Sequence, residues 1–180
     1  MMKRIIVLCL TLLFSSASAQ ASQLNLDPYF GFGTSYLSAE LAGDKASSPG
    51  FYFVAGSALN WISEDLAAEL RLGFGGQYTA FNGDLRLYTS YLLKPSFEIT
   101  RQLDMYVLAG FSTSSVSIAG QNGADASPSF GLGFDYHIPN ESLSVSGEWL
   151  SLYQSSDSSA TSISGMDISG VSISFVFAYY

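Results

Sequence analysis

The chain has 180 residues, of which 48% are hydrophobic, 14% aromatic and 12% charged, whereas soluble domains average about 25% charged residues. This length suits a single domain, and the apolar, aromatic composition excludes a disordered chain. Seven Lys and Arg residues against fifteen Asp and Glu residues exclude a basic surface for nucleic acid. With one Cys and one His, we expect no zinc site, no disulfide framework and no cofactor.

The start of the chain predicts an export signal. Two basic residues precede an almost wholly apolar run at residues 5–14, and small residues follow it. This order is typical of a signal peptide, with cleavage after Ala19 or Ala21. The alternative, a membrane-anchoring helix, needs about 20 apolar residues. We therefore expect a signal peptide at residues 1–19 and a single domain at residues 20–180.

The rest of the chain alternates apolar and polar residues with a period of two, which is the pattern of β-strands. Helical spacing never persists beyond two turns, so the sequence predicts an all-β fold. Each alternating segment is long enough for a tilted membrane strand of about 9–11 residues. The eight predicted strands are residues 28–38, 50–61, 65–78, 84–99, 103–117, 128–138, 142–154 and 167–180.

The polar phase of these strands decides between two architectures. A soluble sandwich or lipocalin-like barrel buries its apolar face, whereas a membrane barrel turns that face to lipid and packs its polar face inside. Here the polar phase is mostly Gly and Ser, with a few charges of both signs, which favours an eight-stranded antiparallel up-and-down transmembrane β-barrel. The strand charges assigned to its lumen are Glu69, Arg71, Arg86, Lys94, Glu98, Asp104, Asp135 and Glu148.

A barrel of eight strands is just wide enough to be filled by side chains. Buried charges persist only when they are paired, so we expect these charges to form a structural plug of salt bridges. A gated ion path through rearranging pairs is the alternative.

Aromatic side chains in the apolar phase lie toward the ends of several predicted strands. Amphipathic rings prefer the level of the lipid headgroups, although aromatic residues also pack in ordinary cores. The residues expected at the two interfaces are Trp61, Tyr78, Phe97, Tyr136, Trp149, Tyr153 and Tyr179.

Short and long connections alternate along the chain. This alternation is typical of bacterial barrels with short periplasmic turns, long extracellular loops and both termini in the periplasm. The short links are residues 63–65, 100–102 and 139–141, and the long ones are 39–49, 79–83, 118–127 and 155–166.

Four segments are the most family-like: AELRLG at 68–73, YVLAGF at 106–111, GLGFDY at 131–136 and FVFAYY at 175–180. With them the chain resembles the small eight-stranded outer-membrane barrels, typified by the membrane domain of outer-membrane protein A, the OmpX/Ail proteins and the opacity proteins. The resemblance implies a Gram-negative outer-membrane location, contact with outer-membrane lipids, and folding by the barrel-assembly machinery. Such barrels end in an aromatic residue on the lipid phase, which Tyr179 rather than the terminal Tyr180 occupies here.

The resemblance also allows an enzyme, because lipid A deacylases and palmitoyl transferases have similar scaffolds and use a His with a Ser near the outer leaflet. His137 falls in the lumenal phase beside a predicted periplasmic turn, so we expect no catalytic residues. The first hypothesis is a non-enzymatic barrel with exposed extracellular loops and an envelope-structural or surface-interaction role. A narrow channel for small solutes or ions comes second, and a lipid-modifying enzyme third. The predicted loops lack basic and aromatic clusters and point to no particular extracellular ligand.

Overall fold

A computed structural model of the protein describes residues 26–41, 43–79, 83–118, 121–154 and 166–178. The predicted signal peptide and its cleavage site lie outside these residues. Within the described ranges, helices long and apolar enough to cross a membrane are absent.

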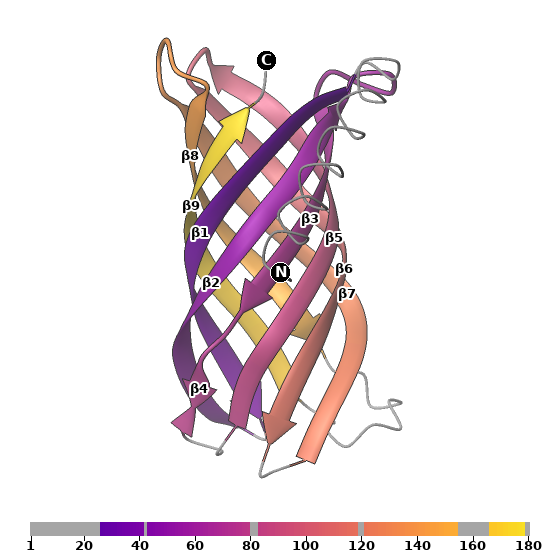
Figure 1. The fold of residues 1–180 in the computed structure, drawn as a ribbon, viewed down its shortest axis with the longest axis vertical. Coiled ribbons are helices and arrows are strands. Elements are labelled where there is room, and N and C mark those ends of the chain that lie inside the picture. The colour runs from indigo at the N-terminus through magenta and orange to yellow at the C-terminus, as the bar shows by residue number, and fades with distance from the viewer. Residues whose placement is uncertain (1–25, 42, 80–82, 119–120, 155–165, 179–180) are drawn as a thin grey trace, which may run out of the picture.

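The described residues form one closed antiparallel β-barrel (Figure 1). β3 and β4 both pair with β5 and act as one strand interrupted at Gly75 and Gly76, while β9 pairs with β1 and closes the sheet. The prediction of eight strands is therefore confirmed. The elements are β1 Leu26–Leu41, β2 Asp44–Leu59, β3 Leu66–Phe74, β4 Gln77–Tyr78, β5 Gly83–Thr100, β6 Leu103–Ile118, β7 Gln121–His137, β8 Leu143–Gln154 and β9 Met166–Ala178.

The two ends of the barrel differ in their connections (Figure 1). We call one end the turn end: it carries the links at residues 60–65, 101–102 and 138–142 together with the start of β1 and the end of β9. The opposite end, the loop end, carries the links at residues 42–43, 79–82, 119–120 and 155–165.

Two of the predicted long loops are mostly strand. β1 and β2 stay paired as far as Leu41 and Asp44, and β6 and β7 stay paired as far as Ile118 and Gln121. The predictions of loops at 39–49 and 118–127 are thus corrected, because paired strands occupy most of both segments. Small and polar residues can continue the ladder there, because the hydrogen bonds between antiparallel strands join backbone groups and do not require apolar side chains.

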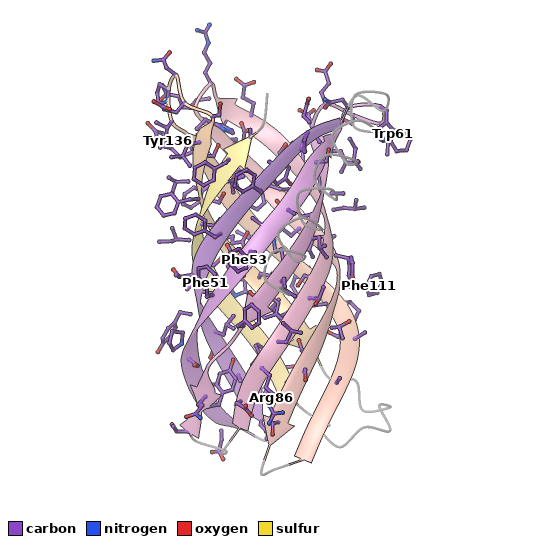
Figure 2. The ribbon with its side chains drawn as sticks, in the orientation of Figure 1. Phe51, Phe53, Trp61, Arg86, Phe111 and Tyr136 are labelled. Atoms are coloured by element: carbon purple, nitrogen blue, oxygen red, sulfur yellow. The ribbon has the colours of Figure 1, made fainter. Side chains whose placement is uncertain are left out.

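Large apolar side chains cover the outside of the barrel, as Figure 2 shows for Phe51, Phe53 and Phe111. The exposed set runs from 37% exposure at Phe51 to 66% at Trp61 and includes residues of all eight barrel strands except β8. Phe30 of β1 stacks on Phe177 of β9, with ring centroids 5.4 Å apart. An outer surface of this kind is stable in lipid and unstable in water.

Glycines on the inside make room for tyrosine rings. A Cβ at Gly133 would lie 2.6 Å from the ring of Tyr106, and one at Gly73 would collide with the ring of Tyr88. The small residues of the polar phase therefore allow large side chains from neighbouring strands to fill the lumen.

Candidate functional site

Five charged side chains meet inside the barrel, each 9% exposed or less. We call them the ionic cluster. They come from β3, β5, β7 and β8, and all point inward because they occupy the polar phase of their strands. The ionic cluster consists of Glu69, Arg71, Lys94, Asp135 and Glu148.

Arg71 joins two strands that are not neighbours in the sheet. Its Nε and Nη2 atoms donate to Oε2 of Glu69, at 2.9 Å and 2.5 Å. Its Nη2 atom also donates to Oε2 of Glu148 at 3.0 Å, and its Nη1 atom donates to Oε1 of the same carboxylate. The planar guanidinium thus bridges β3 and β8 across the lumen, a geometry that an ammonium group cannot reproduce.

Lys94 completes the cluster on the side nearer the turn end. Its Nζ atom lies 2.7 Å from Oδ2 of Asp135 and 3.3 Å from Oε1 of Glu69. It also lies 4.1 Å from the centroid of the Tyr106 ring, which is cation–π distance. Lys94 therefore ties β5 to β3 and β7.

The cluster holds three carboxylates against two cations, and neutral donors satisfy the remaining oxygens. Tyr29 donates to Glu69 and Tyr106 donates to Glu148, each at 2.9 Å. Ser172 donates to Glu148 at 3.0 Å and Ser146 to Asp135 at 2.5 Å. Buried charges need such full satisfaction to be stable.

The structure places the other three predicted lumenal charges elsewhere. Arg86 has a 57% exposed side chain whose Nε lies 3.3 Å from Asp84 at the loop end, so its prediction as a lumenal residue is corrected. A register shift between Leu85 and Leu87 leaves Arg86 without a partner on β6, and a β-bulge of this kind changes the direction of the following side chains. Glu98 is exposed near the turn end of β5, and Asp104 lies apart from the ionic cluster with His137.

An open vestibule of about 670 Å³ leads from the turn end to the ionic cluster. Acidic residues outnumber basic ones in its lining, which includes Glu98, Arg101 and Asp104 on the rim side and ends at Lys94 and Asp135. Within the described part of the chain, no three His, Cys, Asp or Glu side chains are grouped to hold a metal ion.

His137 connects three strands at the vestibule wall. Its Nε2 atom lies 2.8 Å from Oδ2 of Asp104, and its Nδ1 atom lies 2.8 Å from Oγ of Ser144. These are the residue types of a hydrolase triad, a juxtaposition that the sequence analysis did not anticipate. His137 and Ser144 are direct neighbours in the β7–β8 ladder, where polar side chains hydrogen-bond simply because they face each other. The arrangement is thus explained without catalysis.

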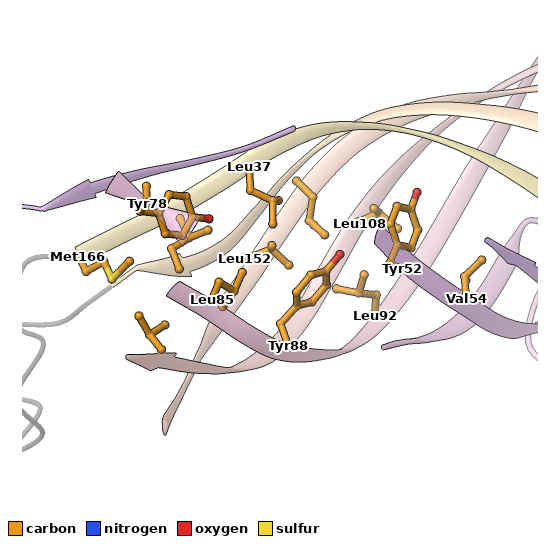
Figure 3. Packing of buried hydrophobic residues seen from close by; sticks show 14 of the residues in the cluster. Leu37, Tyr52, Val54, Tyr78, Leu85, Tyr88, Leu92, Leu108, Leu152 and Met166 are labelled. Atoms are coloured by element: carbon orange, nitrogen blue, oxygen red, sulfur yellow. The ribbon is translucent and has the colours of Figure 1, made fainter. Parts of the chain in front are cut away.

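Beyond the ionic cluster, toward the loop end, the lumen becomes first serine-lined and then apolar. Ser112 donates to Ser90 at 2.6 Å, and Ser129 donates to Ser112 at 2.7 Å. Past these serines lies a set that we call the apolar layer, whose members are at most 4% exposed (Figure 3). The apolar layer consists of Leu37, Ala39, Tyr78, Leu85, Val116, Leu152, Met166 and Ile168.

Tyr78 is the one described aromatic whose predicted interfacial position is contradicted. It is fully buried in the apolar layer. The outward phase of β3 runs through Leu72 and Phe74, but the strand breaks at Gly75 and Gly76. The break resets the alternation, so that Tyr78 points inward.

Three other predicted interfacial aromatics lie at the turn end: Trp61, Phe97 and Tyr136 are 66%, 60% and 44% exposed. Figure 2 shows Trp61 and Tyr136 at that end of the molecule. Trp149 lies farther along the barrel, partly covered by the ring of Phe130 at 5.7 Å. The side chain of Tyr153 and the whole of Tyr179 fall outside the described residues.

Comparisons with solved structures identify the fold. Neisserial surface protein A superposes with a TM-score of 0.68 at 14% identity, over 84% of this chain and 97% of that one. Ail of Yersinia pestis, crystallised with the heparin analogue sucrose octasulfate, gives 0.58 at 13% identity over 86% and 99%. The N-terminal barrel domain of Pseudomonas aeruginosa OprF gives 0.55 at 14% identity over 83% and 97%.

A search of curated proteins finds no match. Residues 6–180, however, match the model of a family described as the outer membrane protein beta-barrel domain. The match covers nearly the whole chain and agrees with the closed eight-stranded barrel and its apolar exterior. The chain therefore belongs to the outer membrane protein beta-barrel domain family, the small bacterial barrels that are embedded in the outer membrane.

Proposed function

We propose that the protein is a closed, non-enzymatic outer-membrane barrel with an envelope-structural or surface-interaction role. The observation that carries this proposal is the ionic cluster, whose five charges are paired with one another across the lumen. The ionic cluster would block the passage of a solute that entered the vestibule.

Two further barriers support a closed lumen. An ion that displaced Arg71 from its two carboxylates would next have to cross the apolar layer, where Tyr78, Met166 and Ile168 are fully buried. Moving an unpaired ion into such surroundings costs several kcal/mol or more. A narrow channel, the second hypothesis, would require both layers to rearrange together.

We place the turn end in the periplasm and the loop end at the cell surface. The longest connection, residues 155–165, is at the loop end, and long connections are extracellular in such barrels. The same orientation places both termini in the periplasm. Export would use the signal peptide, with cleavage after Ala19 or Ala21, and insertion would use the barrel-assembly machinery.

The surface charge argues against a polyanionic partner. The Ail crystals contain a heparin analogue, and binding such a ligand requires an excess of basic groups. At the loop end of this protein the described cations, Lys45 and Arg86, are each paired with a carboxylate. Asp44 and Asp167 add negative charge there. We therefore propose surface interactions that do not depend on sulfate or phosphate recognition.

The test is conductance in planar lipid bilayers, using protein whose folding has been checked by heat-modifiable gel mobility. The native protein is expected to give no stable channel steps. Arg71→Ala is expected to remain closed as well, because the apolar layer is intact in that variant. Stable, ion-selective steps from the native protein would refute the closed barrel and favour the channel.

A further inference from the structure

The apolar belt on the outside stops well short of the loop end. On β1 the outward side chains Phe30, Phe32 and Tyr36 are 41–58% exposed, but the next outward residues are Ser38 and Glu40. The strand itself continues without interruption to Leu41.

The same change occurs on the strands that flank β1. Outward Phe51 of β2 gives way to Ser47 and Lys45, which pair with Ser38 and Glu40. Outward Val171 of β9 gives way to Ser169 and Asp167, which pair with the same two residues of β1. On these three neighbouring strands a polar band thus continues beyond the last large apolar side chains.

β6 and β7 repeat the pattern on another side of the barrel. Phe111 and Phe130 are 63% and 45% exposed, and toward the loop end they are followed in the outward phase by Thr113 on β6 and by Pro128 and Ala126 on β7. These two strands remain paired for five further residue pairs beyond Thr113 and Ala126, ending at Ile118 and Gln121.

The inside changes in the opposite sense at the same level. Where Ser38 and Glu40 face outward, Leu37 and Ala39 face inward and are 2% and 0% exposed. The rest of the apolar layer fills this part of the lumen, as Figure 3 shows for Leu37, Leu85 and Leu152. Where the outside is apolar, by contrast, the ionic cluster, serines and tyrosines share the lumen with a few apolar side chains, namely Val54, Leu92, Leu108 and Leu150.

We infer that the barrel crosses from lipid into water at this inversion, between Tyr36 and Ser38 on β1. Lipid requires apolar side chains outside, whereas water requires them inside. The segments beyond the boundary, residues 37–41, 44–48, 112–118, 121–127 and 166–170, form an extension of the barrel with its own apolar core. At about 3.3 Å per residue and a tilt of about 40°, five residues rise about 13 Å and seven rise about 18 Å above the acyl chains.

The extension defines the surface through which the proposed surface-interaction role would act. Its described outward side chains on β1, β2, β6, β7 and β9 are small or polar, and at the same level the bulge in β5 exposes Leu87. The exposed cation Lys45 is held 3.0 Å from Glu40. Such a surface fits the hydrated headgroups and sugars of the outer leaflet rather than acyl chains. The position of the boundary does not depend on whether the lumen conducts, so the two proposals can fail separately.

Cysteine accessibility tests the boundary, because the predicted mature chain has no cysteine of its own. Single substitutions Ser38→Cys and Thr113→Cys would be compared with Phe32→Cys and Ile173→Cys in lipid nanodiscs, with a water-soluble maleimide as the probe. We expect the first two to react at least tenfold faster than the second two, and all four to react alike after denaturation. Equal protection of both pairs in nanodiscs would overturn the inference.

A second measurement removes the dependence on a reactive thiol. Ser38→Arg is expected to leave the yield of folded, heat-modifiable protein in lipid unchanged, whereas Ile173→Arg lowers it several-fold by placing a charge in the acyl region. A similar loss in both variants would place Ser38 in lipid and refute the boundary.

Discussion

Replacing Arg71 by Met removes the cation that holds the buried carboxylates of Glu69 and Glu148 together. Glu69 would keep Lys94 and Tyr29, and Glu148 would keep Tyr106 and Ser172. Glu148, however, would lose its only cationic partner among the described side chains. Removing one member of a buried ion pair costs about 3–5 kcal/mol, so we expect Arg71→Met to lower the free energy of unfolding by that amount.

Arg86→Met is the matched control, because it makes the same chemical change in an exposed ion pair. In that pair the Nε atom of Arg86 lies 3.3 Å from Oδ2 of Asp84. Surface pairs contribute about 0–1 kcal/mol. Urea unfolding in lipid vesicles, followed by tryptophan fluorescence and gel mobility, would measure both variants. Arg71→Met together with Glu148→Gln should recover part of the loss, since the stranded charge is then removed. If Arg71→Met costs no more than Arg86→Met, the ionic cluster does not stabilise the barrel as argued.

Two further variants test single contacts in the same unfolding assay. Tyr106→Phe removes the hydroxyl that donates to Glu148 and should cost about 1–3 kcal/mol, whereas Tyr91→Phe, at a 62% exposed ring, should cost almost nothing; equal effects would contradict the cluster's role. Leu152→Ala opens a cavity in the apolar layer, where this side chain is 1% exposed, and should cost about 2–5 kcal/mol. A loss below 1 kcal/mol would show that the layer is loosely packed.

The sequence was sufficient for the fold because lipid imposes a strict rule on the strands that cross it. An apolar residue at every second position, as in residues 70–74 or 130–136, is required wherever the outer face meets acyl chains. The alternation therefore predicted the antiparallel barrel, its outward face and the inward placement of all five members of the ionic cluster.

The prediction failed where local geometry breaks the period of two. At Arg86 a bulge turns two successive side chains outward, and at Gly75 and Gly76 an interruption turns Tyr78 inward. Neither the bulge nor the interruption can be predicted from the alternation of apolar and polar residues. The hairpin tips were predicted to be loops because small and polar residues, such as Asp44 and Ser47, are the ones expected in turns.

Which charges meet could not be predicted either. Arg71 and Glu148 are 77 residues apart and lie on strands that are not neighbours in the sheet. Their contact depends on how far each strand is displaced along the barrel axis relative to the next, and this stagger determines which side chains share a level in the lumen. Alternation specifies which face of the sheet a residue occupies, but not its position along the barrel axis.

The inversion along the barrel also explains why the ionic cluster lies where it does. Where lipid surrounds the barrel, the large apolar side chains are needed outside, and the narrow lumen is filled mainly by Gly, Ser, Tyr and paired charges, with a few Leu and Val side chains. Where water surrounds it, the apolar side chains can turn inward, and there the lumen needs no ions at all. The outward side chains of the extension, such as Ser38 and Thr113, belong neither to the ionic cluster nor to the apolar layer. They are therefore the positions at which the displayed surface can change without loss of either the closed lumen or the membrane-spanning belt.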